Sequence, residues 1–318
     1  MIDIDGTKIG TGARPYIIAE VGINAQTNLE LAKRFVEVAA DAGADAVKFQ
    51  THIADAEMVE EAMREVGAGD VYDTLAQCEW SLDEHEQLQA CASEHNVTFL
   101  STPFSVEAVD LLVEVDVPAI KIGSGEMNNR HLTGYAAKTG KPLLVSTGMN
   151  ADTSIEAACN FFDDLDADYA LFYCVSEYPA TAADFDFQTI EALKQVSGVP
   201  VGFSDHSLGV EAAKAAIGYG ADLVEKHFTI DRRLPGPDQG VSIEPEELQD
   251  LCEFATLWHQ TDSTRTGLLE GEIVIKEWAH HSLVAAKLIE KGETLTEKNV
   301  TTKRPGTGMS ASKYFDTL

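Results

Sequence analysis

Short apolar runs that end in a polar residue recur along most of the chain, and a stretch with helical periodicity follows each run. A run of this length bounded by polar residues predicts a buried strand. Eight strand–helix units in ~250 residues predict a (β/α)8 TIM barrel. The predicted strands are Tyr16–Glu20, Ala46–Gln50, Phe99–Thr102, Ala119–Gly123, Leu143–Thr147, Ala170–Cys174, Val201–Ser204 and Leu223–His227.

Other patterns set the predicted organisation of the chain. Asn28, Ser81 and Ser105 stand where N-caps are expected, and Glu84 completes a capping box with Ser81. The segment from Thr51 to Ser81 exceeds an ordinary strand–helix loop, so we predict a functional lid over the barrel mouth. We predict a barrel domain over 1–259, a linker over 260–278 and a short β-rich module over 279–318.

The composition is strongly acidic, with a formal net charge of −30 from 53 acidic and 23 basic residues. Such a charge opposes binding to nucleic acid. Because the acids are spread along the chain, we favour adaptation to high salt (a halophilic protein) over an ordinary acidic protein. The chain has no apolar run of membrane-spanning length and no signal-like N-terminus, which predicts a cytoplasmic protein with no membrane partner. The five cysteines lack metal-site spacing and predict reduced structural thiols.

Two histidines form a candidate metal site. His206 follows the seventh predicted strand and His227 closes the eighth. Neighbouring strands are ~4.8 Å apart, so two imidazoles at matching heights can share one metal at ~2.1 Å each. With open positions left, such a metal would act as a Lewis acid that also binds substrate oxygen.

Cations and hydroxyls mark a candidate site for an anionic substrate. Buried lysines are costly unless they are paired or bind an anion. An alternative is that the two candidate lysines, Lys48 and Lys121, pair instead with the carboxylates of Glu20, Glu126 and Glu225. The candidate residues are Lys48, Lys121, Thr102, Ser124, Ser146 and Ser204.

Eight ordered motifs together resemble the sialic acid synthase (N-acetylneuraminate synthase) family over nearly the whole chain. The segment from Ser282 to Gly308 resembles the start of that family's antifreeze-like (SAF) C-terminal domain, so this domain is expected to be partial. The motifs are Tyr16–Asn24, Val47–Thr51, Ser101–Phe104, Lys121–Glu126, Ser146–Met149, Ser204–Ser207, Glu225–Thr229 and Pro235–Asp238.

The resemblance implies condensation of phosphoenolpyruvate with the open-chain aldehyde of an N-acylated hexosamine such as N-acetylmannosamine, giving a nine-carbon 2-keto acid and phosphate. Lys48, Lys121 and the hydroxyls named above would hold phosphoenolpyruvate, and His206 and His227 a divalent metal, Mn²⁺ ahead of Mg²⁺ or Co²⁺. Glu126 would transfer a proton to or from the attacking water. The sugar would be bound by Glu20, Gln50, Tyr178, Asp238 and Arg304.

The resemblance also implies a domain-swapped homodimer in which Arg304 reaches the sugar site of the partner subunit. Two departures from the family pattern are Ala25, where a histidine is common, and Gln239, where a histidine often follows the aspartate. The alternatives are a legionaminic or pseudaminic acid synthase, a deoxy-sugar-phosphate synthase that uses the same donor, and a non-catalytic sugar-binding paralogue.

Overall fold

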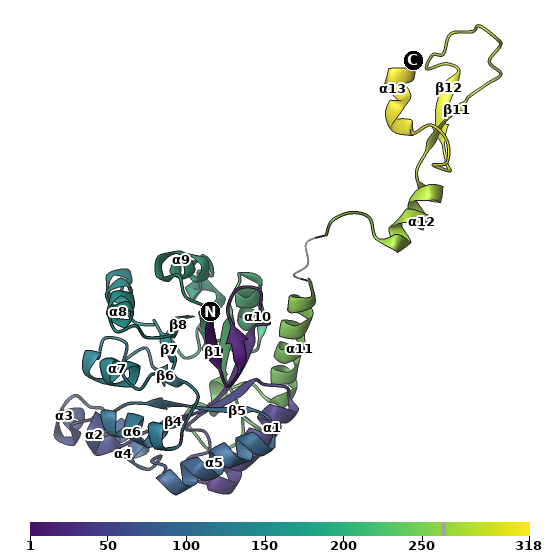
Figure 1. The fold of residues 1–318 in the computed structure, drawn as a ribbon. Helices are drawn as coiled ribbons and strands as arrows, with labels where there is room; N and C mark the ends of the chain where they lie inside the picture. The colour runs from purple at the N-terminus through teal and green to yellow at the C-terminus, as the bar shows by residue number, and fades with distance from the viewer. Residues whose placement is uncertain (262–264) are drawn as a thin grey trace. The chain divides into compact units, whose positions relative to one another are not determined.

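Eight parallel strands close into a barrel in the computed structural model of the protein, which describes residues 1–261 and 265–318 (Figure 1). Each strand pairs with its neighbours in the sequence, and the last strand closes onto the first. All eight predicted strands are present within two residues, so the predicted TIM barrel is confirmed. The strands are β3 (Tyr16–Gly22), β4 (Ala46–Thr51), β5 (Thr98–Pro103), β6 (Ile120–Ile122), β7 (Leu143–Ser146), β8 (Tyr169–Cys174), β9 (Val201–Asp205) and β10 (Leu223–His227).

At least one helix follows each barrel strand, and the N-caps read from the sequence lie where they were expected. Asn28 accepts a hydrogen bond from the Leu31 amide, and Ser81 forms a capping box with Glu84. The helices of the barrel are α1 (Leu29–Asp41), α2 (Ala54–Glu57), α3 (Glu60–Glu65), α4 (Gly69–Ala76), α5 (Leu82–Glu94), α6 (Val106–Glu114), α7 (Arg130–Ala137), α8 (Asp152–Asp164), α9 (Gln188–Ser197), α10 (Glu211–Gly218) and α11 (Pro245–Thr261).

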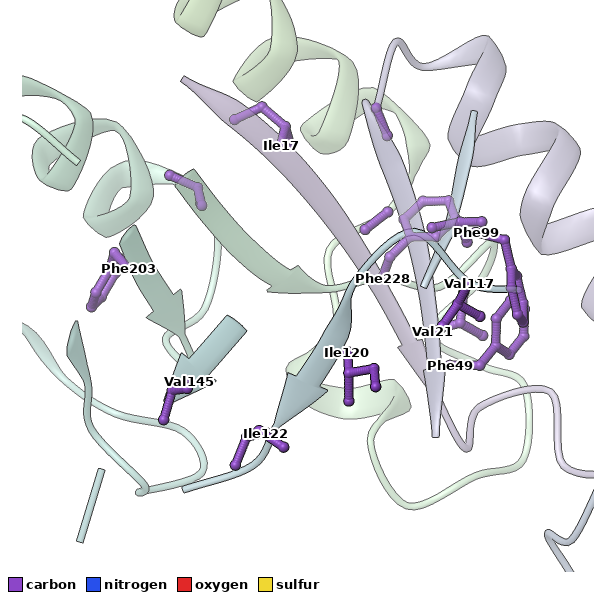
Figure 2. Packing of buried hydrophobic residues seen from close by; sticks show 14 of the residues in the cluster. Ile17, Val21, Phe49, Phe99, Val117, Ile120, Ile122, Val145, Phe203 and Phe228 are labelled. Carbon is purple, nitrogen blue, oxygen red and sulfur yellow. The ribbon is translucent and has the colours of Figure 1, made fainter. Parts of the chain in front are cut away.

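The apolar core has two parts, because residues of a strand alternate between its two faces. One face packs against the surrounding helices, as Ile17, Val21, Phe49 and Phe203 do (Figure 2). The other face fills the barrel interior, where Ile18 lies among residues contributed by other strands. This alternation fixes which polar residues enter the barrel.

An N-terminal hairpin that the sequence analysis missed packs on the barrel interior. Strands β1 (Ile2–Ile4) and β2 (Thr7–Ile9) pair antiparallel around Asp5–Gly6, whose positive φ angles of 51° and 78° suit a tight turn. Its three isoleucines are buried in the same cluster as Ile18. The hairpin therefore belongs to the barrel domain.

The chain divides into two compact units, Met1–Asp262 and Ser263–Leu318. The predicted linker over 260–278 is not irregular throughout, because it contains the end of α11 and most of helix α12 (Glu270–Ala279). The second unit also contains β11 (Ser282–Ala285) and β12 (Val300–Lys303), which pair antiparallel, and α13 (Tyr314–Thr317). Residues 262–264 of the predicted linker lie outside the described residues.

Two further findings concern the described residues. The five cysteines, all in this part of the chain, are buried and free of disulfides, as predicted. No helix within residues 1–261 and 265–318 has both the length and the apolar character needed to cross a membrane.

Candidate active site

A cavity of about 280 Å³ lies where the barrel strands end. Residues two positions beyond the apolar interior layer form its floor, since they share the inward face. Glu20 follows Ile18 in this way, Thr102 follows Leu100, and Glu225 follows Leu223. The cavity brings together most of the predicted site residues, namely Glu20, Lys48, Gln50, Thr102, Lys121, Ser124, Ser146, Tyr178, Ser204, His206 and His227.

The two lysines on the floor are buried and held by carboxylates and hydroxyls. Lys48 Nζ lies 2.7 Å from a Glu20 oxygen and donates to Thr102 Oγ1 at 2.8 Å. Lys121 Nζ donates to Ser146 Oγ at 2.6 Å. The pairing that the sequence left as an alternative is thus present at Glu20.

Glu225 joins the two lysines into one charge network. Each Nζ lies 3.7 Å from one oxygen of this carboxylate, a looser separation than at Glu20. Ser204 Oγ donates to Glu225 at 3.1 Å. Two carboxylates and two ammonium groups therefore balance in charge on the cavity floor.

Burial and this network move the pKa values of the carboxyl groups in opposite directions. Burial raises the pKa of Glu20, and the attraction of Lys48 only partly offsets it. Burial also acts to raise the pKa of Glu225, but Lys121 and Lys48 outweigh it and lower that pKa to about 2. Glu225 is therefore the permanent anion of the pair, while Glu20 is the group that can exchange a proton near neutral pH.

The two histidines stand at the mouth of the cavity, one layer above the charge network. Their ring centroids are 5.6 Å apart. His206 Nδ1 donates to the Val175 carbonyl at 2.7 Å, which leaves Nε2 as an acceptor for the Tyr178 hydroxyl at 2.9 Å. Burial, His206 and Lys48 lower the pKa of His227 to about 3, so His227 is neutral at physiological pH.

The donor set fits a divalent cation. The Val175 contact fixes the tautomer that presents His206 Nε2 toward the mouth, and His227 Nδ1 is buried without a hydrogen-bond partner among the described residues. In that part of the chain, no three His, Cys, Asp or Glu side chains are grouped closely enough to hold a metal. A cation bound here would have two imidazole ligands, with its remaining positions left to oxygen ligands.

A hydrogen-bonded chain that the sequence analysis missed fixes the orientation of Gln50. Gln50 Nε2 donates to Glu20 at 3.2 Å, and Gln50 Oε1 accepts from His52 Nε2 at 3.0 Å. His52 Nδ1 in turn lies 3.0 Å from the Glu57 carboxylate, and the His52 ring stacks on Phe104. Glu57 belongs to α2, which lies in the long segment from Thr51 to Ser81 between β4 and α5 (the inserted segment). The inserted segment is therefore hydrogen-bonded directly to the site.

A second missed feature is a buried ion pair on the outward face of β9 and β10. Lys226 Nζ lies 2.9 Å from Asp205 Oδ2, and both side chains are fully buried. Lys226 also donates to the Ser207 carbonyl, and Asp205 accepts from the Ser207 amide. The pair thus holds the backbone on both sides of His206.

Three predicted residues lie outside the cavity. Asp238 lines an adjoining hollow, and burial raises its pKa. Glu126 accepts from Asn129 at 2.8 Å and does not line the cavity. Arg304 belongs to the second unit, where it donates to the Ala279 carbonyl and lies over the Trp278 ring. The roles of Glu126 and Arg304 stay predictions.

Comparison with known proteins identifies relatives along nearly the whole chain. The NeuB family model matches residues 35–264. The chain is 37% identical to N,N'-diacetyllegionaminic acid synthase of Campylobacter jejuni, over 96% of the chain and 95% of that protein. It is 31% identical to N-acetylneuraminate-9-phosphate synthase of Homo sapiens, over 94% and 85% respectively. The crystal structure of an N-acetylneuraminic acid synthetase from Leptospira borgpetersenii superposes with a TM-score of 0.79 at 32% identity, covering 86% of this chain and 94% of that one.

Proposed function

Because the chain belongs to the NeuB family and is an enzyme of the sialic acid synthase type, we propose that it condenses phosphoenolpyruvate with an N-acylated hexosamine. The new carbon–carbon bond joins the donor to the open-chain aldehyde, and water displaces phosphate to leave a nine-carbon 2-keto acid. The observation that carries the proposal is the pair of buried lysines on the cavity floor, each with a hydroxyl beside it. Because Glu225 lies 3.7 Å from both Nζ atoms, its contacts with the lysines are loose and leave them able to donate to a bound anion.

In this proposal Lys48 and Lys121 neutralise the donor, and the hydroxyls beside them orient it. Lys121 Nζ and Ser146 Oγ form one hydrogen-bonded pair, and Lys48 Nζ and Thr102 Oγ1 form another. Each pair presents an ammonium and a hydroxyl to the same ligand. Ser124 and Ser204 complete the lining.

The acceptor would lie above the donor, between Glu20 on the floor and Gln50 and Tyr178 nearer the mouth, with Asp238 in the adjoining hollow. His206 and His227 would hold a divalent cation, Mn²⁺ ahead of Mg²⁺ or Co²⁺. When bound, this cation would supply Lewis acidity toward the aldehyde oxygen. Glu20 can take up or release a proton near neutral pH, and its contact with Lys48 supports a role for this carboxyl group between the proposed donor and acceptor positions.

Several alternatives exist for the acceptor sugar and the product of the reaction. The product could be an N-acylneuraminate, or a legionaminic or pseudaminic acid, as the names of the relatives indicate. A deoxy-sugar-phosphate synthase is a weaker candidate, because the similarity to 3-deoxy-D-arabino-heptulosonate 7-phosphate synthase is 16% identity and supports only the fold. A non-catalytic paralogue is disfavoured by the intact lysine and carboxylate network.

The test is to incubate the full chain with phosphoenolpyruvate, Mn²⁺ and N-acylated hexosamines, and to measure phosphate release and the mass of the 2-keto acid. Replacing Lys121 with Met removes a charge-assisted contact worth about 2–4 kcal/mol, so kcat/KM for the donor should fall about 30- to 700-fold. The matched control is Lys138→Met on the exposed end of α7, which should leave kcat/KM unchanged. An unchanged donor kcat/KM in the Lys121 variant would refute the donor site.

Metal dependence is tested separately. Treatment with a chelator should abolish turnover and added Mn²⁺ should restore it, while His206→Ala should weaken Mn²⁺ binding measured by titration. Full activity of protein shown to be metal-free would eliminate the cation from the proposal and leave the donor site standing.

A further inference from the structure

The turn that follows strand β6 carries Ser124 into the cavity wall, and the barrel sheet does not hold this turn in place. The hydrogen-bonded ladder between β6 and β7 ends where Ile122 lies opposite Val145. The turn itself is closed by a local hydrogen bond of 3.0 Å from the Glu126 amide to the Gly123 carbonyl. The position of Ser124 relative to β7 therefore depends on contacts made beyond the ladder.

The side-chain amide of Asn150 makes such a contact. Asn150 Nδ2 donates to the Ser124 carbonyl at 2.9 Å and to the Gly148 carbonyl at 2.7 Å. Because both partners are carbonyl oxygens, only the nitrogen end of the amide can face them. Asn150 Oδ1 accepts a hydrogen bond from Asn128 Nδ2. The amide thus joins the β6 turn to the loop after β7, and Asn150 is not among the described residues that line the cavity.

Gly148 shows how closely the loop after β7 approaches the site. A Cβ atom at this position would overlap Ser176 Oγ and would lie 2.9 Å from Ser124 Oγ, which is closer than real Cβ atoms come to other atoms. The Ser124 hydroxyl donates to Cys174 Sγ at 3.6 Å. Glycine therefore leaves just enough room for the Ser124 hydroxyl in this part of the cavity wall.

We propose that Asn150 is a positioning residue for the donor, and that it acts by holding Ser124 in the cavity wall shared with Lys121 and Ser146. Without the two Nδ2 contacts the β6 turn can shift relative to β7, and the Ser124 hydroxyl leaves the position proposed for binding phosphoenolpyruvate. This inference rests on the proposed function, because it concerns the donor of that reaction. It adds a residue that holds the donor site without touching the donor.

The first test is Asn150→Ala in the full chain. Isothermal titration calorimetry with Mn²⁺ present gives the Kd for phosphoenolpyruvate, and phosphate release gives the KM for each substrate. Asn and Ala are both uncharged, so the substitution leaves the charge of the cavity unchanged. A small displacement of a positioned group can cost up to about 100-fold, so we expect the Kd and KM for phosphoenolpyruvate to rise about 10- to 100-fold. The KM for the N-acylated hexosamine should stay the same. An unchanged donor Kd, or an equal rise in both KM values, would overturn the inference.

A double-variant cycle tests whether Asn150 acts through Ser124. Ser124→Ala should raise the donor Kd, and adding Asn150→Ala should then raise it by a smaller factor than in the parent chain, because the hydroxyl that Asn150 holds is gone. Equal factors in the two backgrounds would overturn the inference. An unchanged donor Kd in Ser124→Ala would also overturn it, while the Lys121 variant would still test the proposed function.

A second variant covers the case in which Asn150→Ala does not fold. Asn128 is exposed, and Asn128→Ala removes only the contact that orients the Asn150 amide. Loss of one neutral hydrogen bond should raise the donor Kd about 2- to 10-fold. If Asn150→Ala is unfolded, an unchanged donor Kd in Asn128→Ala would overturn the inference.

The matched control is Asn160→Ala, since Asn160 is exposed on α8 in the same strand–helix unit. It should leave the donor Kd unchanged, and an equal rise in this control would overturn the inference. A partly unfolded variant lowers the binding stoichiometry and not the affinity, so a loss confined to the stoichiometry would also overturn it. If the parent chain does not bind phosphoenolpyruvate, the proposed function itself fails.

Discussion

Replacing the buried Lys226 with Met should destabilise the barrel more than the removal of any exposed lysine of the barrel domain. Lys226 and Asp205 are both fully buried, with 2.9 Å between Nζ and Oδ2. Met preserves most of the side-chain volume but leaves the Asp205 carboxylate buried, with the Ser207 amide as its one remaining side-chain hydrogen-bond partner among the described residues. Breaking a buried pair in this way costs about 3–5 kcal/mol.

The control is Lys141→Met, which removes an ion pair whose Asp116 partner is 87% exposed. Surface pairs of this kind contribute about 0–1 kcal/mol. Both substitutions replace a lysine with methionine and so remove one ammonium group. The difference between their changes in the free energy of unfolding therefore isolates the cost of breaking a buried ion pair.

The assay is urea unfolding at constant KCl, followed by far-UV circular dichroism, with the free energy of unfolding taken from the barrel transition. The double variant Asp205→Asn/Lys226→Met should regain at least ~1–2 kcal/mol over the single variant, because it no longer buries an unpaired charge. A loss below about 1 kcal/mol in Lys226→Met, or a double variant no more stable than the single one, would refute the reasoning.

Three further predictions follow from other parts of the molecule. Glu57→Gln should raise the KM for the sugar more than the KM for phosphoenolpyruvate, because it weakens the His52 contact that orients Gln50; an equal rise in both constants would contradict this. The melting temperature should rise from dilute to molar KCl, because at 1 M salt the repulsion between acidic side chains is screened beyond ~3 Å. A melting temperature that does not change with KCl would exclude salt adaptation. Mixing Arg304→Ala with His206→Ala protein should restore activity if Arg304 serves the partner subunit; a monomer in sedimentation, or no recovery after confirmed subunit exchange, would exclude the shared site.

The barrel was predictable because its signal is local and repeats. Each predicted strand is a short apolar run that ends in a polar residue. The predicted strand Leu223–His227, for example, has the same first and last residues as β10. The floor of the cavity was equally accessible, since strand parity places Lys48 beneath Gln50 and Glu225 beneath His227. The same alternation that buries Leu100 and Leu144 inside the barrel directs Thr102 and Ser146 into the cavity.

The missed features depend on contacts between distant parts of the chain. His52 follows a predicted strand and gives no sign that it bonds to Glu57 on the inserted segment. Asp205 and Lys226 are 21 residues apart and face away from the cavity, so the strand alternation that marks inward-facing residues does not single them out. The Asp5–Gly6 turn was a readable signal, but the flanking strands of three residues are too short for periodicity to stand out.

The buried lysines within an acidic protein have a consequence for the kinetics of donor capture. An approaching phosphoenolpyruvate trianion first meets the long-range field of a chain with net charge −30, and meets Lys48 and Lys121 only after it enters the cavity. At low ionic strength this field opposes encounter, and at 0.15 M salt its reach shrinks to about 8 Å. The association rate constant should therefore increase with salt, opposite to ordinary electrostatic steering, while the dissociation rate constant, set by buried contacts, changes little.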